Sequence, residues 1–202
     1  MNFLSYIYLF KEHYNKGMND FLKATEVIKQ GGVILYPTDT IWGLGCDPSN
    51  DEAVKKVMAI KQRDESKSFI LLVDSIAMLE RFVPEFPEIC YDLLETAIEP
   101  LTIIYPTSRG ISKLVSASDG SIGIRVTQDL FCKKLIQTLR HPILSTSANI
   151  SGHPFPEDFD SIDTQIKEKV DYVLANPAFK SSQTPSKIIK IGKNGEIELI
   201  RR

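Results

Sequence analysis

Residues 31–50 read GGVILYPTDTIWGLGCDPSN, and they indicate the class of fold. The apolar run VILYP at 33–37 is short and rich in large aliphatic side chains, as expected of a buried strand. A helix is predicted on each side of it, one over about 20–30 that ends at a glycine pair and one over 50–62 that opens with an Asn/Asp cap. Residues 38–50 are expected to form a polar loop that follows the strand.

Strands and helices continue to alternate along the rest of the chain. The helices are predicted over 75–82, 87–98, 129–139 and 158–170, and the strands over 69–73, 101–106, 121–126, 141–148 and 171–175. Residues 186–202 hold two β-rich runs around Lys193, Asn194 and Gly195, which predicts a terminal hairpin with Asn-Gly at its turn. The pattern favours one α/β domain with a mixed sheet.

The composition is that of an ordinary globular protein. The chain has 202 residues, of which 43% are hydrophobic and 25% are charged, so one domain with a proper core is expected. The net charge is −2 and the isoelectric point is about 6.0. No global basic field therefore attracts nucleic acid, and any binding of polyanions must be local.

Cysteine and histidine are too dispersed to suggest a metal or disulfide framework. The residues concerned are Cys46, Cys90, Cys132, His13, His141 and His153. Their spacing argues against a zinc ribbon and predicts no metal ligands, and free thiols fit a reducing cytoplasm, where we expect the protein to reside.

The N-terminus, MNFLSYIYLF, is apolar but has neither the basic start nor the cleavage site of a signal peptide. It is also too short to span a bilayer, so no membrane association is expected. The segment that begins at Met18 reads like a natural start. We therefore expect residues 1–17 to be an extension and 18–202 to be the domain.

The segment KQRDESK at 61–67 carries three cations, Lys61, Arg63 and Lys67, at the end of a predicted helix and beyond it. Positive charge at a helix C-terminus is favourable by itself, and surface charge runs are usually solvated. Alternatively, three cations on a short loop before a buried strand can converge on one polyanion, which arginine binds bidentately. Both interpretations remain open on spacing alone.

A second polar cluster, STSANISG at 145–152, directly follows the apolar PIL of a predicted strand. Its hydroxyls and amide lie where α/β sheets bind ligands, at the carboxyl ends of strands, although Ser and Asn also serve ordinary turns. Arg125 lies within the apolar run SIGIRV, where a charge is costly unless it meets a partner. It is either a solvent-facing edge residue or the anchor of a ligand carboxylate.

Several common motifs are missing. GLG at 43–45 lacks the third glycine of a dinucleotide fingerprint, and the chain has no Walker A sequence. STSAN lacks the nucleophile elbow of a serine hydrolase. Cys46 has no obvious histidine partner and is interpreted as a packing residue.

Five segments together resemble one family. YPTDTIWGLGCD, IKQRDESK, SIGIRV, STSANISG and TPSKIIKI occur in the order and at about the spacing of the threonylcarbamoyl-adenylate synthases, the YrdC-like family. The resemblance runs from about residue 20 to the end. Its most specific element is a Lys-x-Arg, here Lys61 and Arg63, followed later by a Ser-x-Asn, here Ser147 and Asn149.

The resemblance implies a single-domain YrdC-like twisted sheet flanked by helices, with a concave and locally basic cavity. It implies a nucleotidyltransferase that makes threonylcarbamoyl-AMP and pyrophosphate from L-threonine, bicarbonate and ATP. Mg²⁺ would accompany ATP, bound mainly through its phosphates. The product would serve the threonylcarbamoyl modification of adenosine 37 in tRNA, so tRNA and the transfer machinery are possible partners.

The resemblance also implies the site residues. The threonine-binding positions are Thr40, Arg125, Ser145 and Ser186; the ATP-binding positions are Arg63, Lys67, Ser121, Ser147 and Arg201; and the catalytic motif is Lys61, Arg63, Ser147 and Asn149. The TDT loop would help to form the threonine pocket, with its glycines letting the backbone turn closely beneath the ligand. The phosphates would be held by the KQR…K side chains and the SAN loop.

The chain departs from the usual family pattern at several positions. These are Trp42, Gln62, Asp64, Ser68, Leu72, Thr127 and Lys187, none of which removes a cation of the motif or the Ser-x-Asn. Two alternatives are a non-catalytic YrdC-like protein that binds nucleotide or double-stranded RNA, and the carbamoyl-transfer domain of hydrogenase maturation. The second belongs to a longer chain with zinc-finger and acylphosphatase parts, which this sequence does not contain.

Overall fold

The computed structural model describes residues 17–63, 68–174, 184–192 and 195–202. Lys67, one of the predicted ATP ligands, and Lys193 and Asn194 of the predicted turn lie outside these residues, as do residues 1–16. The expected boundary between an extension and the domain therefore stays a prediction. The first described helix covers 17–29, close to the predicted 20–30.

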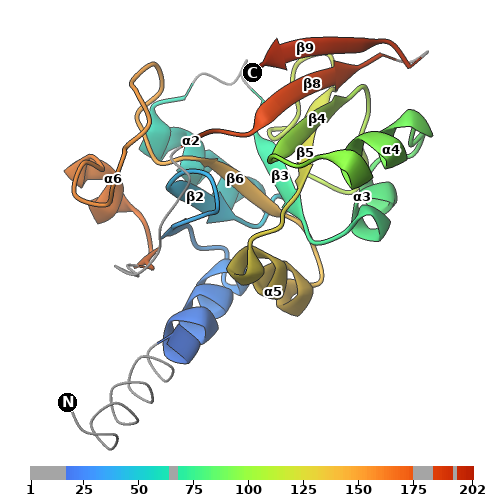
Figure 1. The fold of residues 1–202 in the computed structure, drawn as a ribbon. Coiled ribbons are helices and arrows are strands. Elements are labelled where there is room, and N and C mark those ends of the chain that lie inside the picture. The colour runs from blue at the N-terminus through green and yellow to red at the C-terminus, as the bar shows by residue number, and fades with distance from the viewer. Residues whose placement is uncertain (1–16, 64–67, 175–183, 193–194) are drawn as a thin grey trace, which may run out of the picture.

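One mixed sheet organises the domain (Figure 1). Its strands are β1 (Ile34–Tyr36), β2 (Gly43–Cys46), β3 (Ile70–Val73), β4 (Leu101–Tyr105), β5 (Ile122–Val126), β6 (Ile143–Ser147), β7 (Tyr172–Val173), β8 (Lys187–Ile191) and β9 (Ile197–Arg201). They lie in the order β7-β1-β2-β6-β3-β5-β4-β8-β9. Strand β6 runs antiparallel to both of its neighbours, β2 and β3, whereas β3 and β5 are parallel. The predicted mixed α/β sheet and the terminal hairpin β8–β9 are confirmed.

The helices flank this sheet. They are α2 (Asp51–Lys61), α3 (Ile76–Phe82), α4 (Ile89–Thr96), α5 (Leu130–Leu139) and α6 (Thr164–Lys169). Helix α2 begins where Asn50 Oδ1 accepts hydrogen bonds from the backbone N–H groups of Glu52 and Ala53, both at 3.1 Å. It ends at Gln62, whose φ of 48° is left-handed. This cap sets the direction in which the chain leaves the helix toward Arg63.

Two predicted elements were wrong in extent. Residues 38–50 are not one loop, because Gly43–Cys46 forms β2, paired with β1 on one side and β6 on the other. Glycine is unfavourable in strands, so the segment GLGC carries a weak strand signal, and its pairing comes from tertiary contacts. The helix predicted over 158–170 is shorter and covers only Thr164–Lys169.

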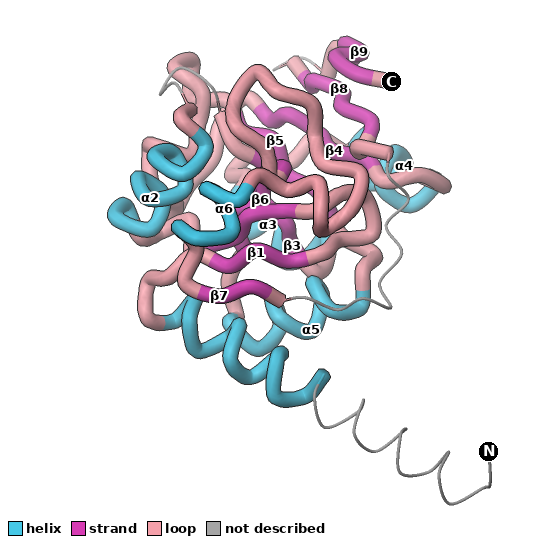
Figure 2. Tube along the Cα trace, turned by 90° about the vertical axis from the view of Figure 1, so that its left-hand side faces the viewer, coloured by secondary structure: helices cyan, strands magenta, loops and turns pink. Residues whose placement is uncertain are grey.

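The hydrophobic core lies where helices pack against the sheet. Helices α3 and α5 contact β3, and α2 contacts β2 and α6. Figure 2 shows β7 beside β1, and Figure 1 shows the β8–β9 hairpin far from the N-terminal helix. Cys46 is fully buried and burial raises the pKa of its thiol, which confirms its interpretation as a packing residue. Within the described residues, no helix has both the length and the apolar character needed to span a membrane.

Candidate active site

A cavity of about 270 Å³ lies over one face of the sheet. Its lining residues alternate along the strands: Ile70 and Leu72 on β3, Thr102 and Ile104 on β4, Gly123 and Arg125 on β5, and Ser145 and Ser147 on β6. Side chains two positions apart in a strand point to the same face, so the sheet itself forms the floor of the cavity.

The last three residues of β6, Ser145 to Ser147, line the cavity, as expected of a polar cluster at the carboxyl end of a strand, but the cavity is not confined to such ends. The rule that ligands bind at these ends holds for open sheets of parallel strands, whose carboxyl ends share one edge. Here β6 runs against β2 and β3, so its carboxyl end does not share an edge with theirs. The cavity instead uses the middle of the sheet, and the segments after β1 and α2 and before β8 add further lining residues.

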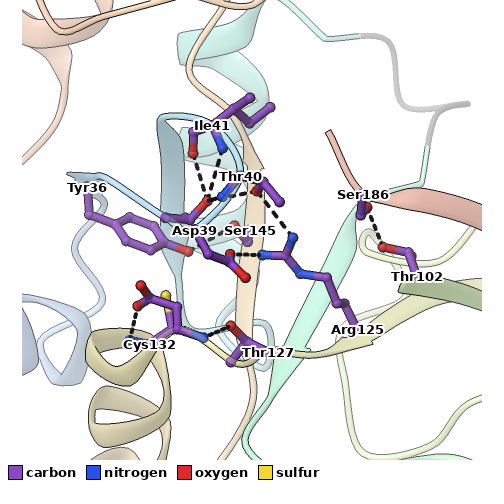
Figure 3. A network of polar contacts seen from close by, with 12 residues as sticks. Tyr36, Asp39, Thr40, Ile41, Thr102, Arg125, Thr127, Cys132, Ser145 and Ser186 are labelled. Atoms are coloured by element: carbon purple, nitrogen blue, oxygen red, sulfur yellow. Dashed lines mark hydrogen bonds and ion pairs between the residues drawn. The ribbon is translucent and has the colours of Figure 1, made fainter. Parts of the chain in front are cut away.

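Arg125 is the most buried charge that lines the cavity, with 4% of its surface exposed. Its Nη1 donates to Thr40 Oγ1 at 3.2 Å and its Nη2 to Asp39 Oδ1 at 3.1 Å (Figure 3). Burial raises the pKa of Asp39, and the Arg125 guanidinium opposes this shift. The charge of Arg125 within the apolar run SIGIRV is therefore buried, and Asp39 is its partner.

Thr38 holds the TDT loop in shape. Its hydroxyl donates to the carbonyl oxygen of Ile41 at 2.8 Å and accepts from the backbone N–H groups of Thr40 and Ile41, both at 3.2 Å. The hydroxyls of Thr38 and Thr40 lie 2.9 Å apart. Because the Thr38 proton is used on Ile41, the Thr40 hydroxyl donates to Thr38, and its remaining lone pairs face Arg125 and the cavity.

The two glycines of GLG leave room for a tyrosine ring and do not form a turn. Gly43 and Gly45 lie in β2 with no positive φ, which corrects the expectation that they let the backbone turn. A Cβ on Gly45 would meet Tyr36 Cε1 at 2.8 Å. The ring of Tyr36 therefore lies over β2, and its hydroxyl donates to Ser145 Oγ on β6 at 2.8 Å. The Gly-x-Gly spacing matches the two-residue period of a strand face.

Lys61 lies beneath the SAN loop. Only 1% of its surface is exposed, and its Nζ donates to the carbonyl oxygens of Ser147 and Asn149 and to Asn149 Oδ1. The Ser147 hydroxyl also donates to Asn149 Oδ1. Burial first, and then the neighbouring Arg63, lower the pKa of Lys61 to about 7. The lysine of the Lys-x-Arg motif thus holds the loop of the Ser-x-Asn motif.

Arg63, which follows the cap of α2, and Arg201, on the edge strand β9, also line the cavity. The Arg63 guanidinium lies 4.6 Å from the centre of the Phe69 ring and donates to the Ser68 carbonyl oxygen. Arg201 donates twice to the carbonyl oxygen of Ser186, at 3.0 and 2.7 Å. Burial lowers the pKa of both arginines, so removal from water disfavours their charged forms. An anionic ligand would offset that cost.

A family model described as "Telomere recombination", that of the Sua5, YciO and YrdC proteins, matches residues 26–202. The chain belongs to the Sua5/YciO/YrdC family. It is 32% identical over 177 residues to a protein of Pseudoalteromonas translucida named threonylcarbamoyl-AMP synthase, covering 86% of this chain and 94% of that one. The family resemblance inferred from the five sequence segments is confirmed.

Two solved structures of Sua5 from P. abyssi have the same fold. A double variant aligns with a TM-score of 0.82 at 25% identity, over 90% of this chain and 55% of that one. A complex with L-threonine aligns with a TM-score of 0.75 at 26% identity, over 85% of this chain and 50% of that one. The chain thus spans about half the length of that Sua5.

The structure gathers most of the residues to which the family resemblance gave a role. Those that line the cavity are Thr40, Arg63, Arg125, Ser145, Ser147, Ser186 and Arg201. Lys61 and Asn149 do not line it, but they hydrogen-bond to each other and Asn149 accepts from Ser147, and Lys67 lies outside the described residues. Ser121 is not among the lining residues, and its hydroxyl donates to Asp119 at 2.6 Å. The ligand roles themselves stay predictions.

Three site residues were missed by the sequence analysis. Thr38 and Thr102 line the cavity, and the Tyr36 hydroxyl donates to Ser145 Oγ, which lines it. Thr102 Oγ1 lies 2.7 Å from Ser186 Oγ, a contact between residues 84 positions apart. Thr38 and Tyr36 belong to the quoted YPTDT segment, so attention to its whole polar set could have found them. No local pattern marks Thr102, which stands within the apolar LTIIY.

Proposed function

We propose that this protein is an L-threonylcarbamoyladenylate synthase, a nucleotidyltransferase that consumes L-threonine, bicarbonate and ATP. The observation that carries the proposal is the lining of one cavity. Three arginines, Arg63, Arg125 and Arg201, share it with eight Ser and Thr residues, in a chain similar to proteins of that name. Such a lining suits a ligand pair that carries a carboxylate and a triphosphate.

Arg125 and the hydroxyls around it are proposed to bind L-threonine. Two of its nitrogens already contact Thr40 and Asp39, which fix the guanidinium in place. Its Nε has no hydrogen-bond partner among the described residues, although it is buried. A buried donor of this kind is costly, and a ligand carboxylate would satisfy it. The hydroxyls of Thr40, Ser145 and Ser186 supply the neutral contacts that fix orientation.

Arg63, Ser147 and Arg201 are proposed to bind ATP, and Lys67 is retained as a proposed fourth contact. Lys61 and Asn149 act behind them, because their hydrogen bonds shape the loop that presents Ser147. Ser121 is retained as a further proposed ATP contact, although its hydroxyl donates to Asp119 Oδ1.

The proposed reaction forms one phosphorus–oxygen bond and breaks another. The amine of threonine combines with bicarbonate to give a carbamate and water. A carbamate oxygen then attacks the α-phosphorus of ATP, and pyrophosphate leaves with the electrons of the cleaved bond. Negative charge grows on the phosphate oxygens, which arginines held in a partly dehydrated cavity would stabilise. Holding the short-lived carbamate against ATP supplies much of the remaining acceleration.

Mg²⁺ is proposed to enter with ATP. Among the described residues, no three Asp, Glu, His or Cys side chains come together as a metal site, so this part of the chain offers no dedicated cage. Bound to the phosphates, the ion would neutralise part of their charge. The product is proposed to serve threonylcarbamoyl modification of tRNA, with tRNA and its transfer machinery as downstream partners.

The test is pyrophosphate release from ATP by the purified protein. We expect release that requires L-threonine and bicarbonate together, stops with EDTA, and does not respond when L-serine or L-valine replaces L-threonine at the same concentration. Release that proceeds without threonine would show a different ATPase activity. No release by folded protein under any of these conditions would overturn the proposal.

A further inference from the structure

Tyr36 and Ser145 form a contact across an intervening strand. Tyr36 lies on β1 and Ser145 on β6, with β2 between them in the sheet. Neighbouring strands are about 4.8 Å apart, so the two backbones are separated by roughly 10 Å. The tyrosine spans this gap only because β2 presents Gly43 and Gly45 beneath its ring. Figure 3 shows the ring directed at Ser145 from the side opposite Arg125.

The hydrogen bond between Tyr36 and Ser145 indicates which of the two hydroxyls is the donor. Tyr36 is fully buried, and among the described residues its hydroxyl has only one partner, Ser145 Oγ at 2.8 Å. Burial raises the pKa of the Tyr36 phenol, so it keeps its proton and donates it. Ser145 Oγ accepts that proton, and among the described residues it donates no hydrogen bond of its own.

We propose that Tyr36 is a positioning residue that makes Ser145 a hydrogen-bond donor toward the substrate carboxylate. With one lone pair of Ser145 Oγ taken by Tyr36, the hydroxyl proton is directed into the cavity that Ser145 lines. Arg125 also lines the cavity, and its guanidinium is a donor that cannot accept this proton. An anionic oxygen held by Arg125 would accept it, and a hydrogen bond to a charged group is worth more than a neutral one.

This inference rests on the proposed function, because it assigns the carboxylate to L-threonine. The test compares the affinities of four variants for L-threonine and for ATP by calorimetry. They are Y36F, S145A, the double variant Y36F/S145A, and the matched control Y105F. Tyr105 is also fully buried, but it does not line the cavity and its hydroxyl has no nitrogen or oxygen partner among the described residues.

We expect Y36F and S145A each to weaken L-threonine binding about tenfold and to leave ATP binding within twofold. The double variant should bind L-threonine no more weakly than S145A, because Tyr36 acts through Ser145. Y105F should bind both ligands as the wild type does. A purely structural role for Tyr36 would instead weaken both ligands and add to the loss in S145A.

Each contrary result has one meaning. If wild-type protein binds no L-threonine, the proposed function and this inference both fail. If wild-type protein binds L-threonine and Y36F binds it equally well, only this inference fails. If Y36F does not fold, as judged by circular dichroism, S145A decides: unchanged threonine affinity in S145A would overturn the role of the Ser145 proton, and a tenfold loss would support it.

Discussion

Lys61 Nζ donates to the backbone oxygen of Asn149 at 2.8 Å, although the two residues stand 88 positions apart. A second hydrogen bond joins the same two segments, from the backbone N–H of Ser151 to the carbonyl oxygen of Lys61 at 2.8 Å. The end of α2 and the loop after β6 therefore form one unit. Arg63 and Ser147, which line the cavity from these two segments, are held together by it.

Replacement of Lys61 should change how stability depends on pH. Burial lowers the pKa of Lys61 to about 7 from its ordinary 10.5, so between these values the unfolded chain binds more protons at this residue than the folded one. The free energy of unfolding from this group therefore rises with pH across that window, by up to about 1.4 kcal/mol per pH unit. K61M should lack this rise.

Urea denaturation of wild type and K61M at several pH values between about 6 and 9 measures the difference. The stability gap between the two proteins should widen in favour of the wild type as the pH increases above about 7. A gap that stays constant over this range would show that Lys61 titrates outside it.

Replacement of Arg125 should weaken the binding of L-threonine but not that of ATP. R125K keeps the charge but presents all its donors from one nitrogen, so it cannot reproduce the planar spread with which Arg125 reaches Thr40, Asp39 and a ligand. We expect its affinity for L-threonine to fall by about ten- to a hundredfold, with ATP affinity nearly unchanged. Calorimetry with each ligand measures this, and an equal loss for both would contradict a separate threonine subsite.

Replacement of Arg63 should weaken the binding of ATP, and Arg81 provides a matched control. Arg63 and Arg81 both lie over a phenylalanine ring, Phe69 and Phe82 respectively, but only Arg63 lines the cavity. R63A should weaken ATP binding at least about tenfold, because a charge-assisted contact to phosphate is lost. R81A should bind ATP as the wild type does. Equal behaviour of the two variants would remove Arg63 from the phosphate site.

Gly45 should tolerate substitution less well than Gly43. A Cβ on Gly45 meets Tyr36 Cε1 at 2.8 Å, whereas one on Gly43 meets its nearest atom, Ser145 Oγ, at 3.4 Å. G45A should lose about 1–3 kcal/mol of stability through overpacking, and G43A less than about 1 kcal/mol. Thermal or urea unfolding compares the two, and the reverse order would contradict the placement of the ring over β2.

Much of the fold was predictable because most of its strands have a clear pattern of apolar residues. FILLV and SIGIRV are nearly continuous apolar runs, and they became β3 and β5 in the middle of the sheet. Strand β2 was not predictable from local pattern, since two of its four residues are glycines. It forms a strand through its pairing with β1 and β6, and Gly45 leaves room for the ring of Tyr36.

Which residues belong to the site could be predicted from the sequence, but how they lie relative to one another could not. The resemblance to the synthases named seven residues that line the cavity, whereas spacing alone left Arg63 and Arg125 open to ordinary interpretations. The sequence placed Lys61 among the phosphate contacts, but its neighbours in space come from a loop almost 90 positions away. Contacts over such separations, like that of Thr102 with Ser186, leave no mark on the local pattern.

The central claim is that the cavity joins a threonine-derived carbamate to the α-phosphate of ATP. Mass spectrometry of the products formed with Mg²⁺, ATP, L-threonine and ¹³C-labelled bicarbonate tests it most directly. The account predicts threonylcarbamoyl-AMP that carries one labelled carbon, disappears when any substrate is omitted, and is strongly reduced in R63A and R125K. Threonyl-AMP without the label, or no adenylate at all from folded wild-type protein, would contradict it.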